Sequence, residues 1–357
     1  MIPQKQQQWV LSDTNGFDSL EFQSDAPIPS IGNREVLVQI HAASLNFRDL
    51  MIAKGQYPFP LKNNLIPVAD GAGVVVAIGP HVDRFRVGDR VAGVFHQDHI
   101  AGPFDITYLR SSLGGALDGT LREYGAFPEQ GLVRIPKNLS LTEAASLPCA
   151  AVTAWAALFP DEGRVLRPGD TVLTEGTGGV STFAVMVIFA KAAGAKVIAT
   201  TSSDEKAERL KQLGADHVIN YKKYPNWGDL AKSLTPNKDG VDIVVEVGGP
   251  ASARQSLTAL KPLGVISLVG SVASFAFGED MSQAPTFLET VTGLCSVRGV
   301  TLGSRRQFEE MNRAIELNDL HPVLDKRVFK LEQAREAYEY LWGQTHVGKV
   351  ILQIIEE

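Results

Sequence analysis

The chain has 357 residues, 44% of them hydrophobic and 21% charged, which is an ordinary composition for a globular protein. Its net charge of −6 gives no support to nucleic-acid binding, which usually requires a basic surface. The sequence has neither an apolar run long enough to span a membrane nor the apolar core of a signal peptide, so we expect a cytoplasmic protein. Two cysteines, Cys149 and Cys295, exclude both a disulfide framework and a zinc site built from several thiolates.

The first 150 residues are expected to form a mainly β domain. Apolar and polar residues alternate with a period of two, which is typical of half-buried strands, and glycines bracket several of the runs. The predicted strands are Glu35–Ala42, Gly71–Gly79, Leu121–Phe127 and Gly131–Ile135.

From about residue 150 to residue 298, short apolar strands alternate with helical segments. Strands are predicted near 171–174, 196–200, 217–219, 241–247 and 265–269, with helices at 180–193 and 204–213 between the first of them. An alanine-rich, helix-prone segment, 142–158, precedes this series. Such alternation predicts an α/β fold with a doubly wound parallel sheet. The tail is expected to add helices at 307–318 and 331–341 and a closing strand from Gly348.

A glycine-rich turn joins the first of these strands to the following helix. Bare backbone N–H groups at a helix N-terminus can bind a pyrophosphate, and side chains in the turn would block its approach. The third small position of the usual pattern is a serine, which still allows close packing. We therefore predict dinucleotide binding at Gly176, Thr177, Gly178, Gly179, Val180 and Ser181.

The end of the second strand bears on the choice of dinucleotide. NAD-binding proteins place an acid there to hold the ribose hydroxyls, but this chain has Thr201, Ser202 and Ser203. Lys206 can supply positive charge, and Ser202 with Glu205 is expected to form a helix capping box. This pattern favours NADP(H), while the alternative interpretation is a plain helix start followed by a solvated lysine.

Several segments together resemble the medium-chain dehydrogenase/reductase superfamily, on the zinc-independent branch that includes quinone oxidoreductases and enoyl reductases. They are Ala43–Asp49, Lys54–Pro58, Pro67–Gly73, Leu147–Trp155 and Gly348–Leu352. The resemblance implies a GroES-like catalytic domain in residues 1–150. It also implies a Rossmann dinucleotide-binding domain in 151–298 and a C-terminal return to the catalytic domain in 299–357.

The same resemblance identifies candidate site residues. Zinc-dependent members carry metal ligands where this chain has Asn46, Ala69 and Cys149, so no catalytic zinc is expected. Asn46 and Tyr57 are the candidate catalytic donors, and Arg48 either stabilises an oxyanion or forms an ion pair with Asp49 or Asp70. Further candidate cofactor contacts are Thr153, Tyr221, Gly248, Gly249, Ser271 and Lys349, the last reaching the pyrophosphate.

The function expected from these features is NADPH-dependent hydride transfer to an activated C=C bond or a quinone, on a small-molecule substrate. Hydrogen bonds stabilise an enolate more readily than the more basic alkoxide formed by direct carbonyl reduction. The alternatives are a zinc-free alcohol dehydrogenase or carbonyl reductase, and a non-catalytic NADPH-binding sensor or partner subunit. A homodimer is expected, with Val265–Val272 as its edge-prone segment.

Overall fold

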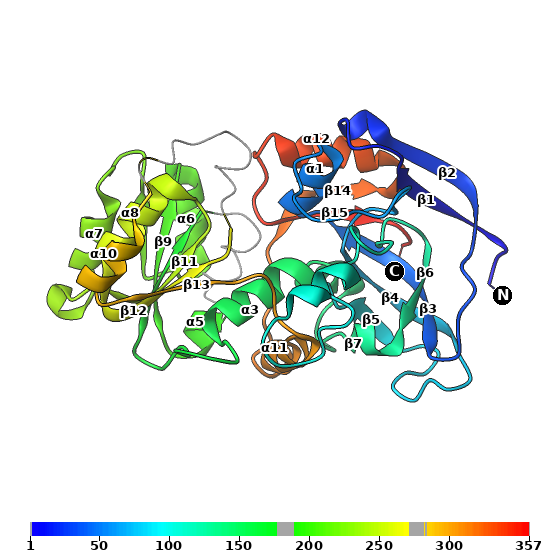
Figure 1. The fold of residues 1–357 in the computed structure, drawn as a ribbon, viewed down its shortest axis with the longest axis horizontal. Coiled ribbons are helices and arrows are strands. Elements are labelled where there is room, and N and C mark those ends of the chain that lie inside the picture. The colour runs from blue at the N-terminus through cyan, green and yellow to red at the C-terminus, as the bar shows by residue number, and fades with distance from the viewer. Residues whose placement is uncertain (1, 177–188, 271–281, 283, 357) are drawn as a thin grey trace. The chain divides into compact units, whose positions relative to one another are not determined.

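The computed structural model describes residues 2–176, 189–270, 282 and 284–356. Its internal contacts divide the chain into two units, each described by itself below. Unit 1 comprises Met1–Val152 and Leu302–Glu357, and unit 2 comprises Thr153–Thr301. The sequence placed the corresponding boundaries at 150 and 298. The predicted fold class, a mainly β domain combined with a doubly wound parallel sheet, is confirmed (Figure 1).

Unit 1 is built around a mixed sheet whose strands follow the predicted alternation. Seven strands of the described chain form it, in the order β14-β15-β3-β4-β5-β7 with β6 also paired to β3. Their bounds are β3 (Glu35–Ser44), β4 (Asp70–Ile78), β5 (Arg90–Gly93), β6 (Tyr124–Pro128), β7 (Leu132–Arg134), β14 (Leu324–Lys330) and β15 (Lys349–Gln353). A separate antiparallel pair consists of β1 (Lys5–Leu11) and β2 (Leu20–Pro27).

The register of three strands determines where the polar residues of unit 1 meet. Ser44 at the end of β3 pairs with Ile351 of β15 on one side and with Asp70 of β4 on the other. Helix α1 (Phe47–Ala53) begins three residues after β3 ends. The start of β15, the start of β4 and the first turn of α1 are therefore brought to the same edge of the sheet.

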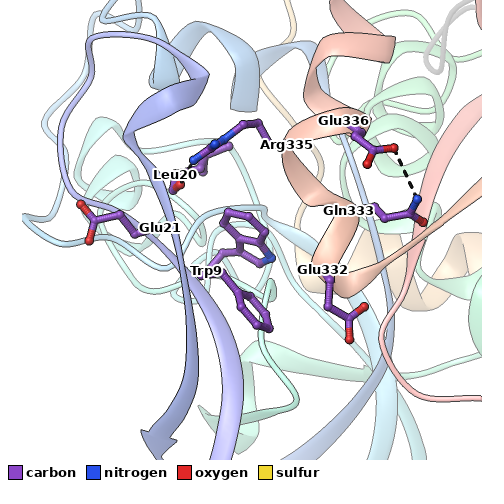
Figure 2. Close-up of a pocket in the computed structure, with 8 residues that line it drawn as sticks. Trp9, Leu20, Glu21, Glu332, Gln333, Arg335 and Glu336 are labelled. Carbon is purple, nitrogen blue, oxygen red and sulfur yellow. Dashed lines mark hydrogen bonds between the residues drawn. The ribbon is translucent and has the colours of Figure 1, made fainter.

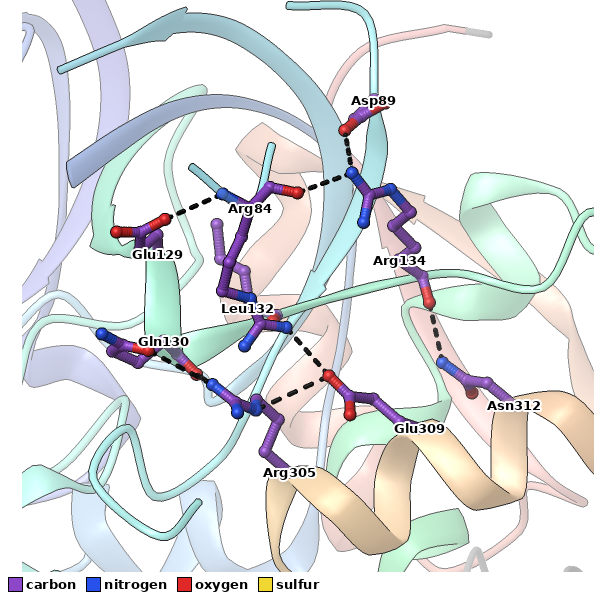
Figure 3. Close-up of polar contacts among 9 residues, drawn as sticks. All are labelled: Arg84, Asp89, Glu129, Gln130, Leu132, Arg134, Arg305, Glu309 and Asn312. Atoms are coloured by element: carbon purple, nitrogen blue, oxygen red, sulfur yellow. Dashed lines mark hydrogen bonds and ion pairs between the residues drawn. The ribbon is translucent and has the colours of Figure 1, made fainter. Parts of the chain in front are cut away.

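The C-terminal return contributes helix α11 (Arg305–Leu317), which polar contacts fix to the rest of unit 1 (Figure 3). Glu309 accepts a hydrogen bond from Arg84 at 2.8 Å and pairs with Arg305 at 3.5 Å. One turn further along, Asn312 donates to the backbone carbonyl of Arg134 at 2.9 Å. The predicted helix 307–318 is thus confirmed, starting two residues earlier than expected.

The last helix of unit 1, α12 (Ala334–Trp342), contacts the N-terminal strand pair. Trp9 donates from Nε1 to the carbonyl of Leu331 at 2.7 Å, and Arg335 donates to the carbonyl of Leu20 at 2.7 Å. Figure 2 shows these side chains around a surface hollow of about 650 Å³, which is open and whose rim carries Glu21, Glu332 and Glu336. These contacts join the N-terminal strand pair to the C-terminal helix. None of the predicted site residues lines the hollow.

Unit 2 contains a parallel sheet of six described strands in the order β10-β9-β8-β11-β12-β13. Their bounds are β8 (Thr171–Glu175), β9 (Lys196–Thr201), β10 (His217–Asn220), β11 (Val241–Glu246), β12 (Leu260–Leu268) and β13 (Ser296–Gly299). The sequence predicted the first five. It did not predict β13, which is the edge strand, so β12 lies inside the sheet and the expectation that 265–272 forms the edge was wrong.

The helices of the described chain follow the predicted order. They are α2 (Leu141–Ala144), α3 (Val152–Leu158), α5 (Phe189–Ala192), α6 (Asp204–Gln212), α7 (Trp227–Ser233), α8 (Pro250–Ala259) and α10 (Phe287–Thr292), with a π-helical turn at Leu147–Ala151. Figure 1 shows α7, α8 and α10 together beside the sheet of unit 2. Most of the predicted helix 180–193 lies outside the described residues. No described helix is both long and apolar enough to cross a lipid bilayer.

Candidate functional site

Helix α1 positions the polar residues that follow β3. Asn46 stands at its N-cap in an extended conformation, and the Asp49 carboxylate accepts a hydrogen bond from the Asn46 backbone N–H at 2.8 Å. Asp49 is 2% exposed, and this burial raises its pKa to about 6 although Arg48 lowers it. The buried Asp49 carboxylate thus caps the start of the helix that carries Asn46 and Arg48.

A buried lysine from the far end of the chain completes this cluster. Lys349, the first residue of β15, is 3% exposed. Its ammonium donates to the carbonyl of Leu45 at 2.9 Å, to Oδ1 of Asn46 at 2.6 Å and to Oδ2 of Asp70 at 3.2 Å. Three acceptors satisfy the three donors of an ammonium group. Burial raises the pKa of Asp70, and the charge of Lys349 opposes that rise.

These contacts orient the Asn46 amide. Because an ammonium only donates, the atom facing Lys349 must be Oδ1, and the NH₂ group is directed elsewhere. Nδ2 of Asn46 and Oδ1 of Asp70 are buried and form no hydrogen bond of normal geometry among the described residues. The amide also lowers the Asp70 pKa, so it lies close to that carboxylate. Asn46 therefore holds an oriented donor beside the Asp70 carboxylate, without a hydrogen bond of normal geometry among the described residues.

Arg48 lies between two aromatic rings. Its guanidinium carbon is 5.0 Å from the ring centroid of Tyr57 and 4.6 Å from that of Phe95. Nη1 donates to the carbonyl of Leu113 at 3.0 Å and lies 3.6 Å from Asp49, so the ion pair left open by the sequence forms with Asp49. Nε and Nη2 have no hydrogen-bond partner among the described residues. The structure thus brings Arg48 and Tyr57 into contact.

In unit 2, the predicted dinucleotide turn begins where β8 ends. Gly176 adopts a left-handed conformation with φ 70°, and its N–H donates to the carbonyl of Thr200 on β9 at 3.0 Å. The other predicted residues of the turn lie outside the described residues: Thr177, Gly178, Gly179, Val180 and Ser181, as does Ser271. Thr153, the first residue of unit 2, is buried in α3.

The end of β9 carries the residues predicted to select the dinucleotide. Thr201 is buried, and its hydroxyl has no hydrogen-bond partner in the described structure. Its carbonyl accepts from the N–H of Tyr221, a residue that is 39% exposed. The predicted capping box of Ser202 and Glu205 was wrong by one residue, since Ser203 is the N-cap of α6 and accepts from the N–H of Lys206 at 3.3 Å.

The loop after β11 holds Gly248 and Gly249, two further predicted cofactor contacts. Their backbone N–H groups donate to the side chains of Glu175 and Glu246. Sequence reasoning missed both glutamates. The available signal was an acid at the last position of two buried parallel strands whose carboxyl ends lie at the same end of the sheet.

The comparisons with known proteins agree with both units. The GroES-like domain family of alcohol dehydrogenases matches residues 32–137, and the zinc-binding dehydrogenase family matches residues 179–317. A zinc-type alcohol dehydrogenase-like protein of Schizosaccharomyces pombe is 45% identical, covering 97% of this chain and 98% of its own length. The chain belongs to the medium-chain dehydrogenase/reductase superfamily. It is accordingly an oxidoreductase of a family whose members bind a nicotinamide dinucleotide.

Other relatives differ in what their names specify. An NADPH-dependent alkenal/one oxidoreductase from the chloroplast of Arabidopsis thaliana is 31% identical, covering 98% of this chain and 80% of its own length. A crystal structure of an NAD-dependent alcohol dehydrogenase superposes with a TM-score of 0.85 at 33% identity, covering 98% of this chain and 99% of that one. Neither the dinucleotide nor the substrate of this chain follows from these names.

The residues at the family's zinc position do not fit a zinc ion. Asn46 turns its oxygen toward the Lys349 ammonium, and Ala69 has no ligand atom. One cysteine, Cys149, beside an amide and an alanine cannot supply the three protein ligands of a catalytic zinc site. The described residues contain no group of three or more histidine, cysteine or acidic side chains arranged to hold a metal. The buried cation beside Asn46 and Asp70 is the ammonium of Lys349.

We predict that Asp70→Asn lowers the free energy of unfolding by about 3–5 kcal/mol, because it leaves the buried ammonium of Lys349 without its counter-ion. Urea unfolding followed by fluorescence measures the change. The matched control is Asp25→Asn, which removes the acid of an exposed pair with Lys5 and should have a negligible effect. Equal effects of the two variants would show that the buried pair is unimportant for stability.

Proposed function

We propose that the protein is a zinc-independent, NADPH-dependent reductase of activated C=C bonds or quinones. The observation that carries this proposal is the Asn46 amide, whose NH₂ group is oriented by Lys349 and forms no hydrogen bond of normal geometry among the described residues. A substrate carbonyl oxygen is the acceptor that would complete it. Bound NADPH would supply the hydride.

The charges around Asn46 suit an enolate-like product. Lys349 donates to Oδ1 of Asn46 and draws electron density away from the amide nitrogen. The NH₂ group is therefore a stronger hydrogen-bond donor, and it stabilises negative charge that develops on a substrate oxygen bound to it. Arg48 adds positive charge, and Tyr57 can deliver a proton to the α-carbon after the hydride reaches the β-carbon. An enolate is a weaker base than an alkoxide, so hydrogen bonds of this kind suffice for conjugate reduction.

The end of β9 supports NADPH as the dinucleotide. Thr201, Ser202, Ser203 and Lys206 offer hydroxyls and a positive charge to a 2′-phosphate, and Tyr221 lies beside them. The nearest acid, Asp204, is exposed and is bonded to Asn220 and Lys223, so its charge is compensated. We assign the pyrophosphate to the turn from Gly176 to Ser181. Thr153, Gly248, Gly249 and Ser271 are assigned to the rest of the nucleotide.

A second candidate function is the interconversion of alcohols with aldehydes or ketones. It is favoured by the likeness to an NAD-dependent alcohol dehydrogenase. In that reaction Asn46 would have to stabilise an alkoxide without a metal, which asks more of one amide donor.

The two functions are separated by measuring NADPH and NADH oxidation with an enone, a quinone and a simple aldehyde. We expect turnover of the enone or quinone with NADPH, and a loss of about 10²–10³-fold in kcat on Asn46→Ala, since one oriented donor contributes about that much. Tyr57→Phe should lower kcat while leaving NADPH affinity unchanged. Turnover of the aldehyde alone would contradict the proposal, and NADPH binding without any turnover would favour a sensor.

We further propose that unit 2 pairs with a second copy through β13. This strand hydrogen-bonds to β12 on one side, and antiparallel pairing of two β13 edges gives a closed twofold dimer. Large apolar side chains of β13 and of α10, the helix that precedes it in the chain, are strongly exposed: Phe287 (95%), Leu288 (77%), Val291 (68%) and Val297 (50%).

Sedimentation should therefore give a mass twice the 38.5 kDa of one chain. Leu288→Glu combined with Val297→Asp should yield monomers, because it places charges on the apolar surface. The control Leu317→Glu changes a leucine of α11 that is 87% exposed and should leave the dimer intact. A wild-type monomer at micromolar concentration would refute this arrangement.

A further inference from the structure

Two buried glutamates stand side by side at the carboxyl edge of the unit 2 sheet. Glu175 ends β8 and Glu246 ends β11, and these strands are paired up to Thr174 and Val245. Their exposed fractions are 5% and 0%. No lysine or arginine of the described chain is hydrogen-bonded or ion-paired to either side chain. Two adjacent carboxylates without a counter-ion cannot both remain ionised at such a site.

Glu246 accepts hydrogen bonds from four donors. Its Oε1 accepts from the N–H groups of Gly248 at 2.8 Å and Gly249 at 3.1 Å and from the hydroxyl of Ser252 at 2.6 Å. Its Oε2 lies 2.5 Å from the hydroxyl of Ser256. Such a shell of short donors is what stabilises an ionised carboxylate.

The hydroxyl of Ser256 reveals the position of the shared proton. It lies between Oε2 of Glu246, at 2.5 Å, and Oε1 of Glu175, at 3.1 Å. A hydroxyl has one proton to donate, so only one of these contacts can use it. The other contact is a hydrogen bond only if a carboxyl group carries a proton. Glu175 accepts fewer and longer hydrogen bonds, from Val247 at 3.1 Å and Gly248 at 3.0 Å, so it is the better carrier of that proton.

We propose that Glu175 and Glu246 share a single proton, carried by Glu175, and act as positioning residues that hold the Val247–Gly249 loop in its nucleotide-binding form. The proposal rests on the function proposed above. All three backbone N–H groups of this loop are committed to the two glutamates, so a nucleotide would contact other atoms of the loop. Gly248 is required by this packing, because a Cβ there would lie 2.3 Å from Oγ of Ser252.

Other charged groups on the surrounding elements are engaged elsewhere. Arg254 of α8 pairs with Glu289. Asp242, at the opposite end of β11, pairs with Arg164 and Lys261. Lys196 at the start of β9 lies at the opposite edge of the sheet from Glu175. Burial and the neighbouring Glu246 raise the pKa of Glu175 well above its ordinary value.

The sign of the pH dependence follows from the proton on Glu175. The unfolded chain loses this proton near the ordinary glutamate pKa, while the folded protein retains it to higher pH. The contribution of Glu175 to stability is therefore greatest below the ordinary value and falls as the pH rises, by up to about tenfold in the folding equilibrium per pH unit, until Glu175 ionises in the folded protein. Above that point, two carboxylates repel beneath the loop, and NADPH affinity should fall as well.

The test compares two isosteric variants of the full-length protein. In Glu175→Gln, the amide reproduces a protonated carboxyl: its oxygen accepts from Val247 and Gly248, and its NH₂ donates to Ser256. In Glu246→Gln, an NH₂ group must face donors. Calorimetric titration with NADPH should give at least about tenfold tighter binding for Glu175→Gln than for Glu246→Gln at neutral pH. The alkaline loss of affinity should be absent in Glu175→Gln.

A second measurement needs neither nucleotide binding nor a folded Glu246→Gln variant. Thermal unfolding of Glu175→Gln should show a smaller decline in stability with rising pH than the wild-type protein, the remainder coming from Asp49 and Asp70, whose pKa values burial also raises. Ser256→Ala should destabilise the protein. Equal NADPH affinities of the two glutamine variants, or an unchanged pH profile of stability in Glu175→Gln, would overturn the proposal. If the wild-type protein binds no NADPH, the proposed function fails, while the stability profile still decides where the proton lies.

Discussion

The ammonium of Lys349 is the interaction on which the architecture of unit 1 depends. Burying a cation is costly unless acceptors and a counter-ion surround it, and here these come from the end of β3, the start of α1 and the start of β4. The C-terminal strand β15 must therefore return to the sheet for the site to exist.

Unit 2 meets a comparable electrostatic constraint with a proton. A pair of buried acids at the edge of a sheet would repel, and one shared proton removes that repulsion while leaving enough acceptors to bind three backbone N–H groups. In both units, then, a buried charged side chain holds a loop or the start of a helix, and other groups of the same chain neutralise that charge. This arrangement fixes backbone geometry without depending on a bound ion.

Local pattern was sufficient to predict the fold class and most of the strands, because burial on one or both faces leaves a periodic record in the sequence. The resemblance added Asn46, Arg48 and Tyr57. It did not predict that Lys349 bonds to Asn46, since these residues are 303 positions apart and the contact depends on the register of β15, β3 and β4. The shift of the α6 cap from Ser202 to Ser203 and the short edge strand β13 also depend on tertiary structure. Pyrophosphate contact by Lys349 stays a prediction.

The most direct measurement of the central claim is the effect of Lys349→Met on two quantities, kcat for enone reduction and the Kd for NADPH. The double variant Lys349→Met/Asp70→Asn removes both buried charges. It is the control for loss of the fold, because neither charge is left buried without its partner. If Lys349 orients the Asn46 amide, kcat falls by at least about a hundredfold while the Kd changes little. An unchanged kcat combined with a large loss of NADPH affinity would contradict this account and return Lys349 to the pyrophosphate.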